Sequence, residues 1–435
     1  LCCISKRCAS DSVATARIVR FSPQGRMDLV ADQLSGPITD LLWADGKLYV
    51  SQRGKISVLE KNGSMHDLVS GLPSHGDHHN NQLAMGPDGK IYFGQGTATN
   101  SGVVGMDSFL MGWLQLHPEV RDVPAKDLEL RENEFKMPDI LSLFAQREMK
   151  MIKTSAFQAF GKTDLKAKGE LKANGTILRM APDGGGLEVF AWGLRNPYGM
   201  AFDSEGKLYV SENGFDERGA RPIAHAPDCV WMIKQGSWYG FPDFAGGEPV
   251  TDAKFKPESG PALKFLLREH PPVEQPFLRR EHHSGVAQLA FCNDKDFGAE
   301  GMLFMAEAGD MNPVTGRHDQ RYGFQVVQIN PRTKEARTFL RTKKEALGPK
   351  GYEYAATAGL RRPVDVKFAP KGGMMLVVDV GAMPIVESAI GPMPRPIPNS
   401  GAVWRITRQP AAAAVRPPAC ELAEPVSVEE LPKEK

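Results

Sequence analysis

A recurring turn phrase constrains the fold of this chain more than any other feature. The phrase combines an acidic residue, glycine, lysine, an aliphatic and an aromatic residue, and it occurs at 45–49 (DGKLY), 88–92 (DGKIY) and 205–209 (EGKLY). Looser versions follow at 300–304 (EGMLF) and 371–375 (KGGMM). Each comes after an apolar segment such as ITDLLWA or YGMAFD. Because glycine adopts positive φ in tight turns, each phrase predicts a β-hairpin, and the chain repeats strand, turn, strand.

The spacing of these hairpins favours a propeller. The first two lie 43 residues apart, from Gly46 to Gly89, within the roughly 40 to 50 residues of one four-stranded blade. Five units are visible, and we expect six, which predicts an all-β, six-bladed β-propeller with an irregular insertion and a disordered C-terminal tail. The terminal segments ARIVRF and GAVWRITR would pair to close the ring and remove an exposed sheet edge.

The chain divides into three predicted parts. Residues 1–14 form an N-terminal cysteine-bearing segment, 15–408 the propeller and 409–435 a tail rich in proline, alanine and glutamate. The hairpin pattern lapses at about 103–171, which we expect to be an insertion with a helix and irregular loops. The tail has few large apolar residues and predicts disorder or a linker.

Charge and cysteine usage exclude several classes of function. With 53 basic and 52 acidic residues, the chain offers no electrostatic case for binding nucleic acid or an anionic membrane. No apolar run is long enough to span a bilayer. The first residue is leucine, which suggests a removed export signal or a shortened chain. The cysteines match no zinc or CxxCH haem pattern, and both end-to-end disulfides and free thiols remain open for Cys2, Cys3, Cys8, Cys229, Cys292 and Cys420.

The segment 75–82 (HGDHHNNQ) concentrates polar, chemistry-bearing side chains ahead of an apolar strand. It holds three histidines, an aspartate, two asparagines and a glutamine. Strand entrances are where propellers present functional groups, since the sheet fixes the position and the loop exposes the side chain. A solvated polar loop with chance histidines is the alternative.

Similar strand ends recur along the chain. The guanidinium in 194–199 (LRNPYG) suits a carboxylate or a carbonyl oxygen, or a salt bridge between blades. The oxygen-rich stretch 211–219 (SENGFDERG) suits calcium, although its spacing is not that of an EF-hand. Further stretches lie at 238–243 (WYGFPD), 281–285 (EHHSG) and 360–366 (LRRPVDV). The aromatic residues among them either stack on a flat ligand or pack between blades.

Taken together and in this order, these stretches resemble the soluble quinoprotein (PQQ-dependent) sugar dehydrogenases of the glucose/sorbosone dehydrogenase family, as a divergent branch. The resemblance covers about residues 16–408. It implies a six-bladed propeller that binds pyrroloquinoline quinone (PQQ) and calcium and oxidises an aldose-type sugar to its lactone. It also implies a periplasmic or extracellular protein. Because no haem motif is present, electrons would pass to a separate acceptor such as a cytochrome or a quinone.

The resemblance implies roles for single residues. His78 matches the catalytic histidine, with Asp77 beside it in the cofactor site. His79 is then a neighbour, although a shift of one residue would exchange the two. Arg195 and Asn196 match the pair that contacts the quinone, Arg195 with a catalytic role.

Calcium and the rest of the cofactor would be held further along the chain. The main-chain carbonyls of Gly214 and Phe215 match the calcium turn. Arg362 matches an arginine that faces a PQQ carboxylate, and Tyr239 is expected to contact the cofactor. Val364 stands where the family pattern has a second arginine.

Two other functions use the same architecture. One is a calcium-dependent lactonase-type hydrolase in which a histidine activates water, and the other is a non-catalytic propeller that serves as a binding or assembly module. The pair Arg195 and Arg362 favours the dehydrogenase, because an anionic cofactor needs cations that a lactone does not.

Overall fold

The computed structural model describes residues 15–22, 24–139, 150–316, 320–343, 359–388 and 391–407. The predicted N-terminal segment, the tail and Cys2, Cys3, Cys8 and Cys420 lie outside these residues. Within them the fold is all-β, as predicted, and the helices are short: α2 (Met106–Leu110), α3 (Trp113–Leu116), η1 (Ala253–Phe255) and η2 (Lys295–Phe297). None of these helices is long and apolar enough to cross a bilayer. Cys229 and Cys292 are buried free thiols.

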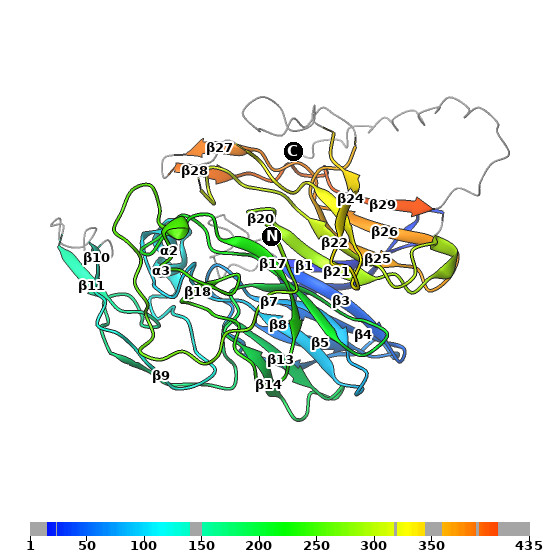
Figure 1. The fold of residues 1–435 in the computed structure, drawn as a ribbon. Coiled ribbons are helices and arrows are strands. Elements are labelled where there is room, and N and C mark those ends of the chain that lie inside the picture. Colours follow the sequence, from blue (N-terminus) through cyan, green and yellow to red (C-terminus); the bar gives the residue numbers. More distant parts are fainter. Residues whose placement is uncertain are drawn as a thin grey trace, which may run out of the picture.

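Antiparallel sheets form the blades of a propeller (Figure 1). The first blade contains β3 (Ile38–Ala44), β4 (Lys47–Gln52), β5 (Lys55–Leu59) and β6 (Met65–Val69). The second contains β7 (Asn80–Met85), β8 (Ile91–Gln95), β13 (Thr176–Met180) and β14 (Glu188–Trp192). The third contains β15 (Pro197–Phe202), β16 (Leu208–Glu212), β17 (Pro227–Ile233) and β20 (Leu278–His282). The fourth contains β21 (Val286–Phe291), β22 (Leu303–Glu307), β23 (Gln325–Ile329) and β24 (Ala336–Arg341), and the fifth β25 (Pro363–Phe368), β26 (Met374–Asp379) and β29 (Ala402–Thr407).

The described residues therefore form five blades, and the expectation of six is wrong. The N-terminal strand β1 (Thr15–Phe21) pairs with β2 (Met27–Ser35), and β29 pairs with β26, so no ladder among the described strands joins the two ends. The predicted closure by ARIVRF and GAVWRITR does not occur. The physical reason is local: the β1–β2 hairpin buries Ile18 and Leu34 against Val50 of the first blade. The terminal strand thus gains its apolar burial there.

The innermost strands follow one another around the propeller. Strand β3 lies beside β7, β7 beside β15, β15 beside β21, and β21 beside β25. Side chains also connect the later blades with the first: Nζ of Lys367 on β25 of the fifth blade lies 3.5 Å from Oδ1 of Asp40 on β3. The Gln288 amide on β21 of the fourth blade donates to the Thr39 carbonyl at 2.6 Å. Polar contacts therefore link both the fourth and the fifth blade to the first.

The predicted turn chemistry explains the hairpins. Asp45 and Gly46 have φ angles of 50° and 76°, so both central residues of the β3–β4 turn adopt the left-handed conformation that two-residue hairpins favour. The predicted hairpin around 87–89 is confirmed by the pairing of β7 with β8, with Gly89 at φ 72°. Apolar side chains such as Ile56 and Phe93 then pack between adjacent blades. Local turns and interblade burial therefore specify the same strands.

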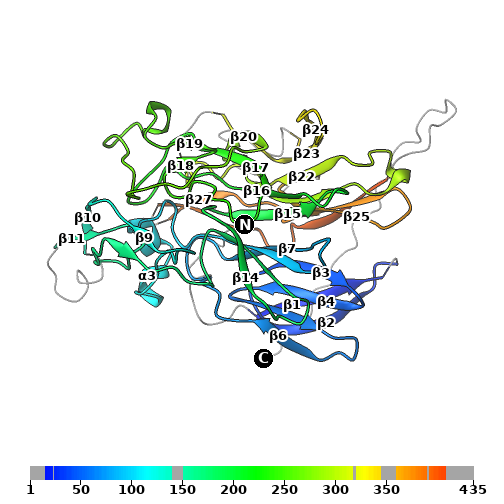
Figure 2. The same ribbon diagram turned by 60° about the horizontal axis from the view of Figure 1, so that its bottom comes forward.

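Shorter elements gather at one end of the molecule, which lies on the left in Figures 1 and 2. The segment between β8 and β13 carries α2, α3 and two small hairpins, β9 (Leu128–Glu129) with β12 (Lys166–Ala167) and β10 (Phe135–Pro138) with β11 (Met151–Thr154). The pairs β18 (Phe244–Ala245) with β19 (Glu248–Pro249) and β27 (Ile385–Ser388) with β28 (Gly391–Pro394) lie at the same end. The predicted insertion thus extends the end of the second blade that faces away from the turn phrases.

Candidate active site

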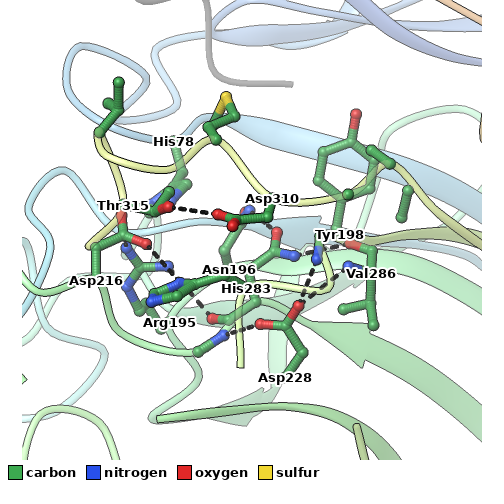
Figure 3. A pocket seen from close by; sticks show the side chains of 18 of the residues that line it. His78, Arg195, Asn196, Tyr198, Asp216, Asp228, His283, Val286, Asp310 and Thr315 are labelled. Carbon is green, nitrogen blue, oxygen red and sulfur yellow. Dashed lines mark hydrogen bonds and ion pairs between the residues drawn. The ribbon is translucent and has the colours of Figure 1, made fainter. Parts of the chain in front are cut away.

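A pocket opens where loops from successive blades converge (Figure 3). It holds about 830 Å³ of empty space, part of which is open to solvent. Its lining combines polar side chains with small or apolar ones. The polar residues include His78, Arg195, Asn196, Asp216, Arg218 and His283, and the apolar residues include Met111, Val286, Ala287, Met311, Val314 and Val364. Four predicted site residues, His78, Arg195, Asn196 and Gly214, therefore meet in one pocket.

The geometry of His78 leaves one ring nitrogen for chemistry. Its Nδ1 lies 3.0 Å from the Thr97 carbonyl oxygen, which can only accept, so Nδ1 carries the hydrogen and Nε2 the lone pair. Burial lowers the pKa of His78 well below its usual value, and the nearby charges of Arg195 and Arg218 lower it further. The imidazole is therefore neutral at neutral pH and offers Nε2 as a base.

The neighbours of His78 occupy different positions. His79 does not line the pocket, and burial, reinforced by Arg53, lowers its pKa to about 3. Asp77 points to Arg218, with its Oδ2 2.6 Å from Nη2. The structure thus brings His78 to the pocket, while Asp77 lies outside the lining and holds the histidine loop through its ion pair with Arg218.

Arg195 is held by several oxygen atoms. Its Nε donates to the Asn100 carbonyl at 2.9 Å, and its Nη2 contacts the Asn100 side chain at 2.8 Å and Oδ2 of Asp216 at 3.1 Å. Only 3% of its surface is exposed. Asn196 accepts from the Asn81 amide at 2.9 Å and donates to Asn213 at 2.8 Å. Both predicted quinone contacts are therefore fixed before any ligand arrives.

Arg218 is a pocket residue that the sequence pattern did not single out. It forms ion pairs with Asp77 at 2.6 Å, Asp107 at 2.7 Å and Asp216 at 2.9 Å. Burial opposes its charge, but the three carboxylates outweigh burial and raise the pKa of Arg218 well above its usual value. For Asp216, burial is likewise outweighed by Arg195 and Arg218, and its pKa is lowered. These ion pairs connect the histidine loop, α2 and the loop after β16.

The predicted calcium turn lies partly at the pocket. Gly214 lines it, and a Cβ there would lie 2.5 Å from the Pro227 carbonyl oxygen, so the turn requires glycine. Its N–H donates to Asp228 at 2.8 Å. Burial raises the pKa of Asp228 to about 6 despite the hydrogen bonds it accepts. Phe215 instead buries its ring in the core, stacked on Phe241.

Arg362 and Tyr239 lie behind the pocket, and neither belongs to its lining. Arg362 donates to the carbonyls of Ala308, Gly309 and Asp310 at 3.1, 2.8 and 3.0 Å, so it supports a loop that does line it. The Tyr239 hydroxyl accepts from the Lys234 N–H at 2.8 Å, and its ring packs edge-on against Trp231. Their contact with a cofactor stays a prediction.

Further pocket residues follow β22, at 308–315 (AGDMNPVT). Asp310 accepts from the Asn312 N–H and the Thr315 hydroxyl, both at 2.9 Å. Met311 and Val314 add apolar side chains to the lining. Residues 308–315 lie at the end of a strand, as the histidine loop does. The same sequence signal could therefore have identified them.

The polar residues of the pocket fit a quinone. Arg195 and Asn196 supply a guanidinium and amides for quinone oxygen and nitrogen atoms, and His78 supplies a neutral base. Three aspartates, Asp216, Asp228 and Asp310, line the pocket beside two arginines, so an anionic cofactor would need an added cation. In the described ranges, no three His, Cys, Asp or Glu side chains converge to hold a metal ion. A calcium ion would therefore depend on main-chain carbonyls and ligand oxygens.

Comparisons with known proteins point the same way. Residues 158–322 match the family model "Glucose / Sorbosone dehydrogenase". Quinoprotein glucose dehydrogenase B from Acinetobacter calcoaceticus is 27% identical over 202 residues, which span 46% of this chain and 33% of that protein. The chain thus matches a third of the length of this curated relative.

Two solved structures are more distant. The PQQ-bound aldose sugar dehydrogenase from Streptomyces coelicolor is 17% identical with a TM-score of 0.44. The match covers 84% of this chain and 82% of the Streptomyces chain. The soluble apo aldose sugar dehydrogenase from Escherichia coli is 14% identical with a TM-score of 0.47, over 83% and 87% of the two chains. The match to the glucose/sorbosone dehydrogenase family model over residues 158–322 includes Arg195, Asn196, Gly214 and His283 of the pocket.

Proposed function

We propose that the chain oxidises an aldose-type sugar to its lactone, with PQQ as the hydride acceptor and calcium as its counter-ion. The observation that carries the proposal is the placement of a neutral His78 beside Arg195 and Asn196 in one pocket. The family match and the relative named as a quinoprotein glucose dehydrogenase support it. A hydrolase needs a base as well, but it does not need the guanidinium and amide pair that fits a quinone.

His78 acts as the base. Nδ1–H stays on the Thr97 carbonyl, so Nε2 takes the proton of the sugar hydroxyl at the carbon that is oxidised. The low pKa of His78 keeps Nε2 unprotonated through the neutral range. The two electrons leave the carbon as hydride, and a bound quinone would supply the acceptor.

Arg195, Asn196 and the Gly214 turn hold and polarise the cofactor. The Arg195 guanidinium, already oriented by Asn100 and Asp216, would face the oxygen on which negative charge develops. The main-chain carbonyls of Gly214 and Phe215 would hold calcium, which balances the aspartates of the pocket. Electrons would then pass to a separate acceptor such as a cytochrome or a quinone. A periplasmic or extracellular location belongs to the same proposal.

The test is a titration of the purified protein with PQQ in the presence of calcium, followed by quinone absorbance. A panel of aldoses with a dye acceptor is then added, and the same protein is assayed for lactone hydrolysis without PQQ. Saturable PQQ binding with sugar-dependent dye reduction is the expected result. Absence of PQQ binding at micromolar concentrations, together with lactone hydrolysis, would overturn the proposal in favour of the hydrolase.

A further inference from the structure

A second histidine shares the pocket with His78. His283 directly follows β20, is 8% exposed and lines the same pocket as Arg195. Its backbone has a φ of 55°, in the left-handed region that non-glycine residues seldom adopt. Such a conformation persists where the surroundings hold it, and it is frequent at ligand sites.

The surroundings that hold His283 also hold the predicted calcium turn. Oδ2 of Asp228 accepts from the Ser284 hydroxyl at 3.0 Å, the Gly285 N–H at 2.7 Å and the Val286 N–H at 3.2 Å. Its other oxygen accepts from the Gly214 N–H at 2.8 Å. One buried carboxylate therefore fixes the backbone after His283 relative to Gly214.

The ring of His283 is oriented by a second carboxylate. Its Nδ1 lies 3.6 Å from Oδ1 of Asp216, while Oδ2 of Asp216 binds Arg195 at 3.1 Å (Figure 3). Arg218 lies on the same Oδ2 at 2.9 Å. His283 and Arg195 thus lie against the two oxygen atoms of one carboxylate. This arrangement sets the ring of His283 beside the Arg195 guanidinium.

Space and charge around His283 suit a ligand contact. A Cβ at Gly316 would lie 3.3 Å from Nε2, so glycine at that position leaves room beside this nitrogen. The two arginines of the pocket are already paired with aspartates, and the lining residue Val364 carries no charge. An anionic ligand in this pocket would therefore gain from one more donor near Arg195.

We propose that His283, oriented by Asp216, donates a hydrogen bond to an oxygen of the bound quinone cofactor beside Arg195. This inference rests on the proposed function, and it assigns His283 to cofactor binding. His282 is a matched neighbour for comparison. Its ring packs against His225, His283 and Tyr322, and it does not line the pocket.

The experiment titrates PQQ into the calcium-loaded protein at pH 7 and follows quenching of intrinsic fluorescence. His283→Gln replaces the imidazole with a neutral amide and should weaken binding about tenfold, the loss expected for one hydrogen bond to an anionic cofactor. His283→Lys supplies a cationic donor at the same position and should recover most of the affinity, which a purely structural role would not. His282→Gln should bind within about twofold of the unaltered protein.

The outcomes separate the two proposals. If the unaltered protein binds PQQ and His283→Gln binds it equally well, the role of His283 is wrong and the proposed function stands. The same conclusion follows if His283→Lys binds no better than His283→Gln. If the unaltered protein binds no PQQ, both proposals fail. Thermal unfolding of each variant establishes that the compared proteins are folded.

Discussion

Nη2 of Arg218 lies 2.6 Å from Oδ2 of Asp77, and this ion pair joins the loop after β16 to the histidine loop of the second blade. The same guanidinium contacts Asp107 next to the N-terminus of α2 and Asp216 at the pocket wall. Because Asp77 directly precedes His78, the position of the base depends on an arginine from another blade. Arg218 therefore positions the histidine loop.

Replacing Arg218 tests this dependence. Arg218→Met leaves Asp77 and Asp107 buried without their cation, so we expect a loss of about 3–5 kcal/mol in the free energy of unfolding. The double variant with Asp77→Asn should recover part of the loss, since one orphaned charge is then removed. Urea denaturation of the single and double variants measures both effects. Equal stability of Arg218→Met and the unaltered protein would contradict the role of these ion pairs.

The two adjacent histidines make a matched pair for catalysis. His78→Gln should lower turnover by about a hundredfold to ten-thousandfold, the usual contribution of a general base, and leave PQQ affinity largely intact. His79→Gln should keep its rate, because His79 does not line the pocket. Steady-state rates with a dye acceptor and PQQ titrations provide the two readouts. A loss confined to His79→Gln would show that the base is the other histidine.

Glu212 predicts a pH dependence of stability. Burial raises its pKa to about 7, even though it accepts from the Arg195 N–H and the Trp231 indole. Because the folded pKa exceeds the unfolded one, Glu212 contributes stability below about pH 4.5 that is lost as the pH rises through 7. The full effect is about 3 kcal/mol. Glu212→Gln should flatten the fall in unfolding free energy between pH 5 and pH 8, measured by urea denaturation. An unchanged slope would refute the assignment.

The hairpins were predictable because their signals are local. The glycine of each turn phrase and the flanking apolar residues specify a hairpin whatever surrounds it, as at Gly46 and Gly89. The number of blades was not predictable in this way. The alternation of apolar and polar residues in β1 is the same whether the strand pairs with β29 or with β2. The packing of Ile18 and Leu34 on Val50 decides between the two pairings.

The site was predictable to the extent that strand entrances converge. His78, Arg195 and Gly214 lie at strand ends and meet in the pocket. Arg218 lies further along an irregular loop, and whether such a loop returns to the pocket depends on its ion pairs with distant residues. Conversely, Arg362 precedes a strand but donates to main-chain carbonyls behind the wall. Position at a strand end therefore predicts proximity and leaves side-chain direction open.

Contacts of Lys367 connect the first and last blades. Its Nζ lies 3.5 Å from Asp40 and from Asp365, and Asp40 also accepts the Leu83 N–H at 3.0 Å. Lys367→Met should lower the free energy of unfolding by about 1–2 kcal/mol, a modest value because the ammonium keeps part of its surface in water. Lys47 is about as exposed as Lys367, but its partner Glu60 belongs to the same blade and is less buried than Asp40, so Lys47→Met serves as the control. Equal losses in the two variants would argue against a role in joining the blades.

Val364 gives a prediction of gained affinity. Its side chain lines the pocket, in which three aspartates outnumber two arginines. Val364→Arg would add a third cation to this lining and reduce the repulsion of an anionic ligand, so PQQ should bind about tenfold more tightly. Because the added attraction is electrostatic, raising the salt concentration should reduce the gain. Val364→Met adds bulk without charge and should give no gain. Thermal unfolding of Val364→Arg at an unchanged temperature establishes that this variant is folded. Equal or weaker PQQ binding by it would then show that charge at position 364 does not limit the affinity for an anionic cofactor.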